Sequence, residues 1–105
     1  MPTFDEVWII DHSTTTAEAA GHQGGRWGRG GDLLYRWGNP EAYRAGVATD
    51  QQLGFQHDPR FIPPGRPGAG NLTVFNNRYV TGSQSAAQEL VLPVDALGNF
   101  VLGPN

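Results

Sequence analysis

Glycine and proline recur every few residues along this chain, and together they make up 23 of its 105 residues. They follow no triplet repeat, so the composition does not indicate a collagen-like chain. Both residues interrupt helices, and no apolar pattern of helical or heptad period persists for more than about a dozen residues. The sequence therefore excludes long helices and coiled coils, and it favours short strands joined by turns.

The apolar content is moderate. Hydrophobic residues make up 38% of the chain, and eleven residues are aromatic. This is too apolar for a disordered tail, yet modest for a domain that must be stable alone. A chain of this length suffices for one small domain and not for two. We expect one all-β unit that is poor in core for its size.

The charges are few and dispersed. The net charge is −3, and all seven basic residues are arginines, spread from Arg26 to Arg78 without a basic stripe, so we expect no nucleic-acid partner. The absence of cysteine excludes disulfides and thiolate metal sites but leaves the compartment open. No apolar run reaches the roughly 20 residues of a membrane span, and residues 1–5 lack the features of a signal peptide.

The first part of the chain predicts two strands, at residues 6–11 and 32–37, where β-branched and aromatic residues cluster. Between them lies a polar, glycine-rich stretch that contains one helical turn over residues 17–20, with Thr16 as its cap. The second strand closes at a Gly-Asn-Pro turn, and a short helix is expected over residues 40–46.

The second part of the chain predicts four short strands joined by turns, which is an antiparallel meander. The expected strands are residues 57–62, 71–75, 86–92, and a last one that starts at residue 100 after a turn at 94–99. A four-stranded meander of this length is the size of one blade of a β-propeller.

Four segments resemble the bacterial arylsulfotransferase family. They are WIIDHSTT (8–15), GDLLYRWGNP (31–40), QHDPRFIP (56–63) and GNLTVFNN (70–77), and the last two are the most specific. The resemblance implies a six-bladed β-propeller, of which this chain would hold about one and a half blades. Residues 1–40 would be the outer half of one blade with an enlarged hairpin loop, 41–56 the connection between blades, and 57–105 the next blade.

The resemblance also implies an activity, the transfer of a sulfuryl group from an aryl sulfate to a phenol through a sulfated histidine, without a nucleotide donor or another cofactor. His57 is the candidate catalytic or sulfate-binding residue, because it begins the inferred innermost strand and imidazole is a nucleophile and a general acid or base. Arg78 and Asn76 are the candidate substrate-binding residues; a guanidinium would clamp the sulfate oxygens.

Plainer interpretations stand beside these. His57 would then be a structural histidine, Arg78 a solvated loop residue, and Asn76 a turn residue. His12 and His22 have no metal-binding spacing, so no metal is expected. The glycine-rich stretch 24–31 lacks the lysine of a phosphate-binding loop.

A propeller blade buries its faces only against its neighbours, so this chain is expected to need either missing blades or a homo-oligomer. Because the family site draws histidines from several blades, the chain alone is expected to be inactive. The alternative function is that of a non-catalytic module, which self-assembles or binds a partner through an exposed strand edge.

Overall fold

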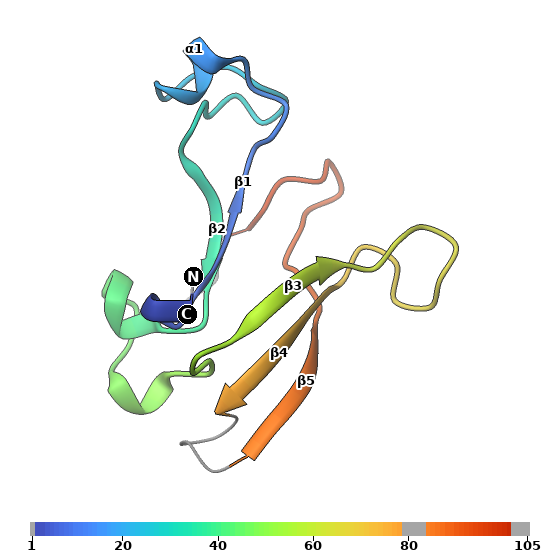
Figure 1. The fold of residues 1–105 in the computed structure, drawn as a ribbon. Coiled ribbons are helices and arrows are strands. Elements are labelled where there is room, and N and C mark those ends of the chain that lie inside the picture. Colours follow the sequence, from blue (N-terminus) through green and yellow to red (C-terminus); the bar gives the residue numbers. More distant parts are fainter. Residues whose placement is uncertain (1, 79–83, 102–105) are drawn as a thin grey trace.

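The structure, a computed structural model, describes residues 2–78 and 84–101 and shows a mostly β arrangement (Figure 1). Within these residues there are two small antiparallel sheets. The first contains β1 (Val7–Ile10) and β2 (Leu33–Trp37), and the second contains β3 (His57–Phe61), β4 (Leu72–Arg78) and β5 (Gln84–Leu90). Four short helices accompany them: η1 (Pro2–Phe4), α1 (Thr16–Ala19), η2 (Pro40–Tyr43) and η3 (Ala48–Asp50). The prediction of short antiparallel strands with little helix is confirmed.

The first sheet is a hairpin with a long loop. Val7 pairs with Trp37, and Ile9 pairs with Tyr35. The helical turn in the loop is capped by Thr15 and not, as predicted, by Thr16. Thr15 has an extended backbone, its hydroxyl accepts the N–H of Glu18 at 3.3 Å, and the Glu18 carboxylate accepts the N–H of Thr15 at 3.4 Å. This reciprocal capping box is what sets the start of the helix one residue earlier.

The second sheet has its strands in sequence order, β3-β4-β5, as a meander requires. His57 pairs with Phe75, and Leu72 pairs with Leu90. The predicted strand at 71–75 is longer, because β4 continues to Arg78, and the one predicted at 86–92 runs instead from Gln84 to Leu90.

The predicted fourth strand of this meander does not join the sheet in the part of the chain that the structure describes. Phe100 makes only an isolated bridge, to Val94. Asp95 folds the intervening turn by accepting backbone N–H groups, and Trp27 Nε1 donates to the carbonyl of Gly98 at 3.2 Å. Phe100 also stacks on Tyr35 of β2. These contacts hold the segment against the first sheet and away from β5. Leu102, the end of that predicted strand, lies outside the described residues.

The two sheets share a small core. It is formed by Val7 of β1, Leu53 of the connection, and Leu72 and Val74 of β4, with Trp37, Leu90 and Leu92 packed against it. Leu53 belongs to the segment 41–56, which was expected to be a connection and contains η3 and most of η2. No helix among residues 2–78 and 84–101 is long and apolar enough to cross a membrane.

Candidate functional site

His57 stands at the open edge of the second sheet. It is the first residue of β3, and among the strands that the structure describes β3 pairs only with β4. Its imidazole is exposed and lies against the ring of Phe75, with 5.0 Å between ring centres and a 50° tilt. The neighbouring Asp58 carboxylate accepts from Arg60 Nε at 2.7 Å, so it is engaged along its own strand. The imidazole is therefore open to solvent, with an aromatic surface beside it.

Asn76 lies on the opposite face of the sheet from the His57 and Phe75 pair, because successive side chains of a strand alternate between faces. Its side chain is fully buried. Its Oδ1 accepts the N–H of Gly54 at 3.0 Å, and its Nδ2 donates to the Gln52 carbonyl at 2.8 Å and to Gln88 Oε1 at 2.9 Å. The structure thus does not bring the side chains of His57 and Asn76 together; Asn76 fixes the connection between the sheets to β4 and β5.

Arg78 is the last residue of β4. Since Phe75 pairs with His57, the backbone of Arg78 lies three residues beyond that pair, which is about 10 Å along the strand. Both residues belong to the same end of the sheet, as predicted. The side chain of Arg78 is outside the described part of the chain, so the predicted clamp on a sulfate stays a prediction.

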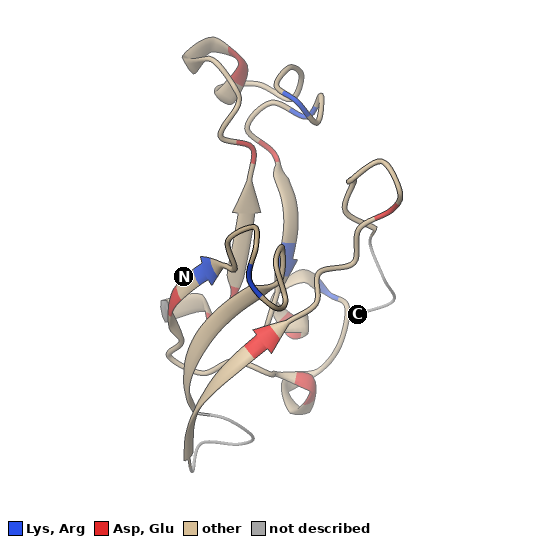
Figure 2. Cartoon of the chain, turned by 90° about the vertical axis from the view of Figure 1, so that its right-hand side faces the viewer, with Lys and Arg blue, Asp and Glu red and all other residues tan. Residues whose placement is uncertain are grey.

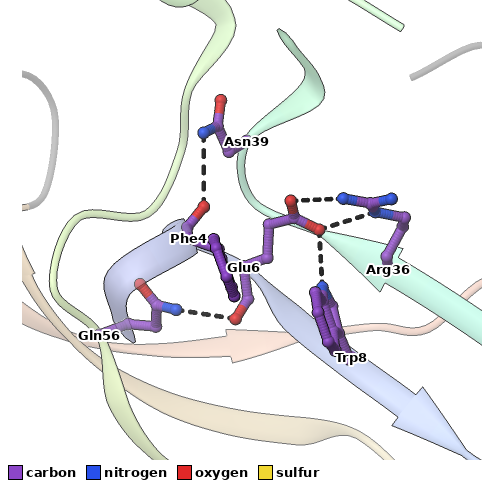
Figure 3. A network of polar contacts seen from close by, with 6 residues as sticks. All are labelled: Phe4, Glu6, Trp8, Arg36, Asn39 and Gln56. Carbon is purple, nitrogen blue, oxygen red and sulfur yellow. Dashed lines mark hydrogen bonds and ion pairs between the residues drawn. The ribbon is translucent and has the colours of Figure 1, made fainter. Parts of the chain in front are cut away.

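The backbone just before His57 is tied to the first sheet. Gln56 is buried, and its Nε2 donates to the carbonyl of Glu6 at 2.8 Å (Figure 3). The N–H of Phe55 donates to Asp5 Oδ1 at 2.8 Å. Phe55 and Asp5 both have a positive φ, 49° and 57°, a conformation that non-glycine residues rarely adopt. These contacts determine where β3 begins and therefore where His57 stands.

A buried ion pair that the sequence analysis did not single out lies beside these contacts between Glu6 and Gln56 (Figure 3). The side chain of Glu6 is 1% exposed, and its carboxylate accepts Arg36 Nε at 2.7 Å, an Arg36 terminal nitrogen at 2.6 Å and Trp8 Nε1 at 2.8 Å. The hydrogen bond to Glu6 raises the pKa of Arg36. Both carboxylate oxygens are engaged within the fold, so this cluster holds the first sheet together. Glu6 and Arg36 lie 30 residues apart in the sequence and meet because Trp8 pairs with Arg36 across the hairpin.

The Arg36 guanidinium also lies over two aromatic rings, with its central carbon 4.7 Å from the Tyr43 ring centre and 5.9 Å from that of Trp8. Burial raises the pKa of Tyr43, and the Glu6 carboxylate adds to the rise. Trp8 also stacks on Phe4, whereas Tyr35 stacks on Phe100 and Trp37 packs on the shared core.

The long hairpin loop is organised by Asp11. Its carboxylate accepts the Ser13 hydroxyl at 2.6 Å, the Ser13 N–H at 2.8 Å and the Trp27 N–H at 3.3 Å. The hydrogen bond from the Ser13 side chain is the main cause that lowers the pKa of Asp11. In the same loop His22 Nδ1 lies 2.6 Å from Asp32 Oδ1 on the surface. No group of three potential ligands among residues 2–78 and 84–101 is placed to hold a metal ion.

The described basic residues are dispersed over several loops and strands (Figure 2). No family model matches the chain, and comparison with curated proteins and with solved structures also finds no match. The resemblance to arylsulfotransferases therefore stays a prediction.

Proposed function

We propose that this chain is a segment of an arylsulfotransferase-like β-propeller, in which His57 takes part in sulfuryl transfer from an aryl sulfate to a phenol. The observation that carries the proposal is the exposed imidazole of His57 at an open strand edge, with the ring of Phe75 5.0 Å away. Imidazole near neutral pH is both a nucleophile and a proton carrier, and an aromatic side chain beside it offers a stacking surface to an aryl group.

The transfer needs two displacements. In the first, an imidazole nitrogen of His57 attacks the sulfur, the bond between sulfur and the aryl oxygen breaks, and the phenolate leaves and takes a proton from water. In the second, the acceptor phenol gives its proton to water, its oxygen attacks the sulfur, and the nitrogen–sulfur bond breaks. In the alternative role the protonated imidazole binds the sulfuryl oxygens and forms no bond to sulfur.

The arrangement of the sheets supports the propeller part of the proposal. The strands β3, β4 and β5 lie side by side in sequence order, and one face of this sheet packs on the first sheet through Val7, Leu53, Leu72 and Val74. Neighbouring blades of a propeller likewise bury apolar residues against each other. Among the candidate residues, His57 is the one histidine, whereas the family site takes histidines from several blades. We therefore expect no sustained turnover from the isolated chain.

The test is to incubate the folded protein with an aryl sulfate donor, with and without a phenol acceptor, and to measure intact and peptide masses. We expect the donor to leave a single sulfuryl group on His57, without the repeated release of phenol that turnover would give. The adduct should be absent from His57→Ala and present in His12→Ala, a matched control on the exposed loop. A binding role instead predicts no adduct, with a shift of the His57 imidazole resonances on adding the donor. A folded protein that shows neither result removes the sulfotransferase proposal.

A second function, partner binding by a non-catalytic module, is favoured by a different observation. Large apolar side chains are exposed around the open edge of β1, among them Phe4, Ile10 and Phe61. Sedimentation tests the self-assembly form of this function: a closed homo-oligomer that persists in His57→Ala supports it, and a monodisperse monomer restricts the function to other partners.

A further inference from the structure

A groove of about 220 Å³ lies between the first and second sheets, lined by residues Val7–Ile10 and by Pro59, Phe61 and Leu72. Successive side chains of a strand point to opposite faces, so four consecutive residues line a groove only if it follows the edge of the strand. The groove therefore runs along the backbone edge of β1, with β3 on its other side.

Among residues 2–78 and 84–101, β1 pairs with β2 alone, so no described strand lies beside its other edge. In an antiparallel pair alternate residues direct their N–H and C=O groups away from the partner. Where the two sheets meet, Gln56 Nε2 already donates to the carbonyl of Glu6, the residue before β1. Figure 1 shows β1 and β3 running in different directions from there. The groove thus opens along β1 just beyond a side-chain hydrogen bond that joins the second sheet's connection to the start of β1.

The edge of β1 has fewer of the features that protect exposed strand edges, although its register against β2 shifts between Ile9 and Ile10. On the facing edge, Pro59 has no N–H to offer, the register is irregular between His57 and Arg60, and Asp58 and Arg60 form an ion pair. Proline, bulges and charges are the devices that discourage pairing. Residues Val7–Ile10 include no charge and no proline, so an added strand is accepted at β1 and not at β3.

The size of the exposed apolar surface around the groove indicates what kind of partner it can bind. Phe4, Trp8, Ile10 and Phe61 are 50%, 38%, 59% and 54% exposed, which amounts to roughly 400 Å² of apolar surface in one region. A stable dimer buries about 800 Å² on each partner, so this surface is too small to hold a second copy by itself. It is sufficient to cover a single added strand, and every residue that lines the groove is uncharged.

We propose that the edge of β1 binds an extended, uncharged strand of another polypeptide, with apolar residues at alternate positions, by β-strand addition. Main-chain hydrogen bonds give such binding its register, and the alternate side chains that enter the groove give it selectivity. This inference rests on the partner-binding function above and assigns its surface and its partner; it is independent of sulfuryl transfer at His57.

The test uses a blocked synthetic peptide of alternating threonine and valine, and the same peptide with N-methyl groups on alternate residues, which removes the donors of one edge. Calorimetry should show binding of the first peptide and not of the second, and hydrogen exchange should show slower exchange of alternate β1 amides. Ile10→Lys puts an ammonium into the groove and should weaken binding at least about tenfold. Leu97→Lys, at a position 85% exposed and away from the groove, should bind like the wild type.

The outcomes separate the two levels of the proposal. If the peptide binds but Ile10→Lys binds it as tightly as the wild type, or if the methylated peptide binds equally well, strand addition at β1 is refuted and partner binding survives. If the wild type binds neither peptide, strand addition at β1 is refuted, and if it also sediments as a monomer, the self-assembly form of partner binding is refuted with it. A dimer that Ile10→Lys abolishes would make a second copy the occupant and overturn the assignment to another polypeptide.

Discussion

Replacing Asn76 by alanine tests whether a buried amide holds the two sheets together. The side chain is fully buried and makes hydrogen bonds with Gly54, Gln52 and Gln88 at 2.8–3.0 Å. A hydrogen bond contributes about 1 kcal/mol net, and a buried donor left without a partner costs about 1–3 kcal/mol. Since Gly54 is itself buried, we expect Asn76→Ala to lower the free energy of unfolding by about 3 kcal/mol.

Urea unfolding followed by tryptophan fluorescence measures this loss. With a slope of about 1.5 kcal/mol per molar urea, the midpoint should fall by about 2 M. The matched control is Asn77→Ala, the same substitution at the adjacent, exposed position; surface substitutions usually change stability by less than about 0.5 kcal/mol. If the two variants unfold within about 0.5 kcal/mol of each other, the amide does not join the sheets and the reasoning is refuted.

Two further predictions concern the first sheet and its loop. Arg36→Met should lower the free energy of unfolding by about 3 kcal/mol because it leaves the buried Glu6 carboxylate without its cation. Glu6→Gln should lower it less, because the part-exposed guanidinium can hydrate. Equal losses in urea unfolding would contradict this. The pKa of Asp11 is lowered in the fold, mainly by the Ser13 hydroxyl, so its contribution to stability is present above the unfolded pKa and is lost as the pH falls through the folded one. An NMR titration should show an apparent pKa of Asp11 below 3.8, the ordinary value. Asp11→Asn should remove the part of the pH dependence of the unfolding free energy that this carboxyl contributes at acid pH. A titration of Asp11 at the ordinary value would contradict the prediction.

The strands could be predicted from the sequence because their signals are local. Runs of β-branched and aromatic residues placed β1 and β2 within one residue at each end, and the segment before the Pro-Pro-Gly turn placed β3 equally well. The prediction of a fourth strand in the meander was wrong because residues far away in the sequence determine where this segment lies. Phe100 stacks on Tyr35, and Trp27 bonds the carbonyl of Gly98, 71 residues away. Nothing in residues 94–102 taken alone records those partners.

The candidate site was predictable only in part for a similar reason. The position of His57 at the start of a strand follows from the local pattern, and the structure agrees. The burial of Gln56 and Asn76 does not, since amide side chains at strand ends ordinarily indicate turns. Their roles depend on how two sheets from separate parts of the chain approach each other. The groove along β1 depends on the same approach, and therefore no sequence motif marks it.

Buried polar contacts between the two sheets explain how so small a core holds them in one arrangement. Four residues, Val7, Leu53, Leu72 and Val74, form the buried cluster, and apolar contacts are non-directional. Gln56 Nε2 donates to the carbonyl of Glu6, and the amide of Asn76 bonds the backbone of the connection. Each of these bonds forms in one geometry, and misplacing a buried amide is costly. Because β3 begins next to Gln56 and β1 next to Glu6, the same bonds set both the position of the His57 imidazole and the width of the groove. Loss of these hydrogen bonds should therefore impair sulfuryl transfer and strand binding together. By contrast, His57→Ala should impair only sulfuryl transfer, and Ile10→Lys only strand binding.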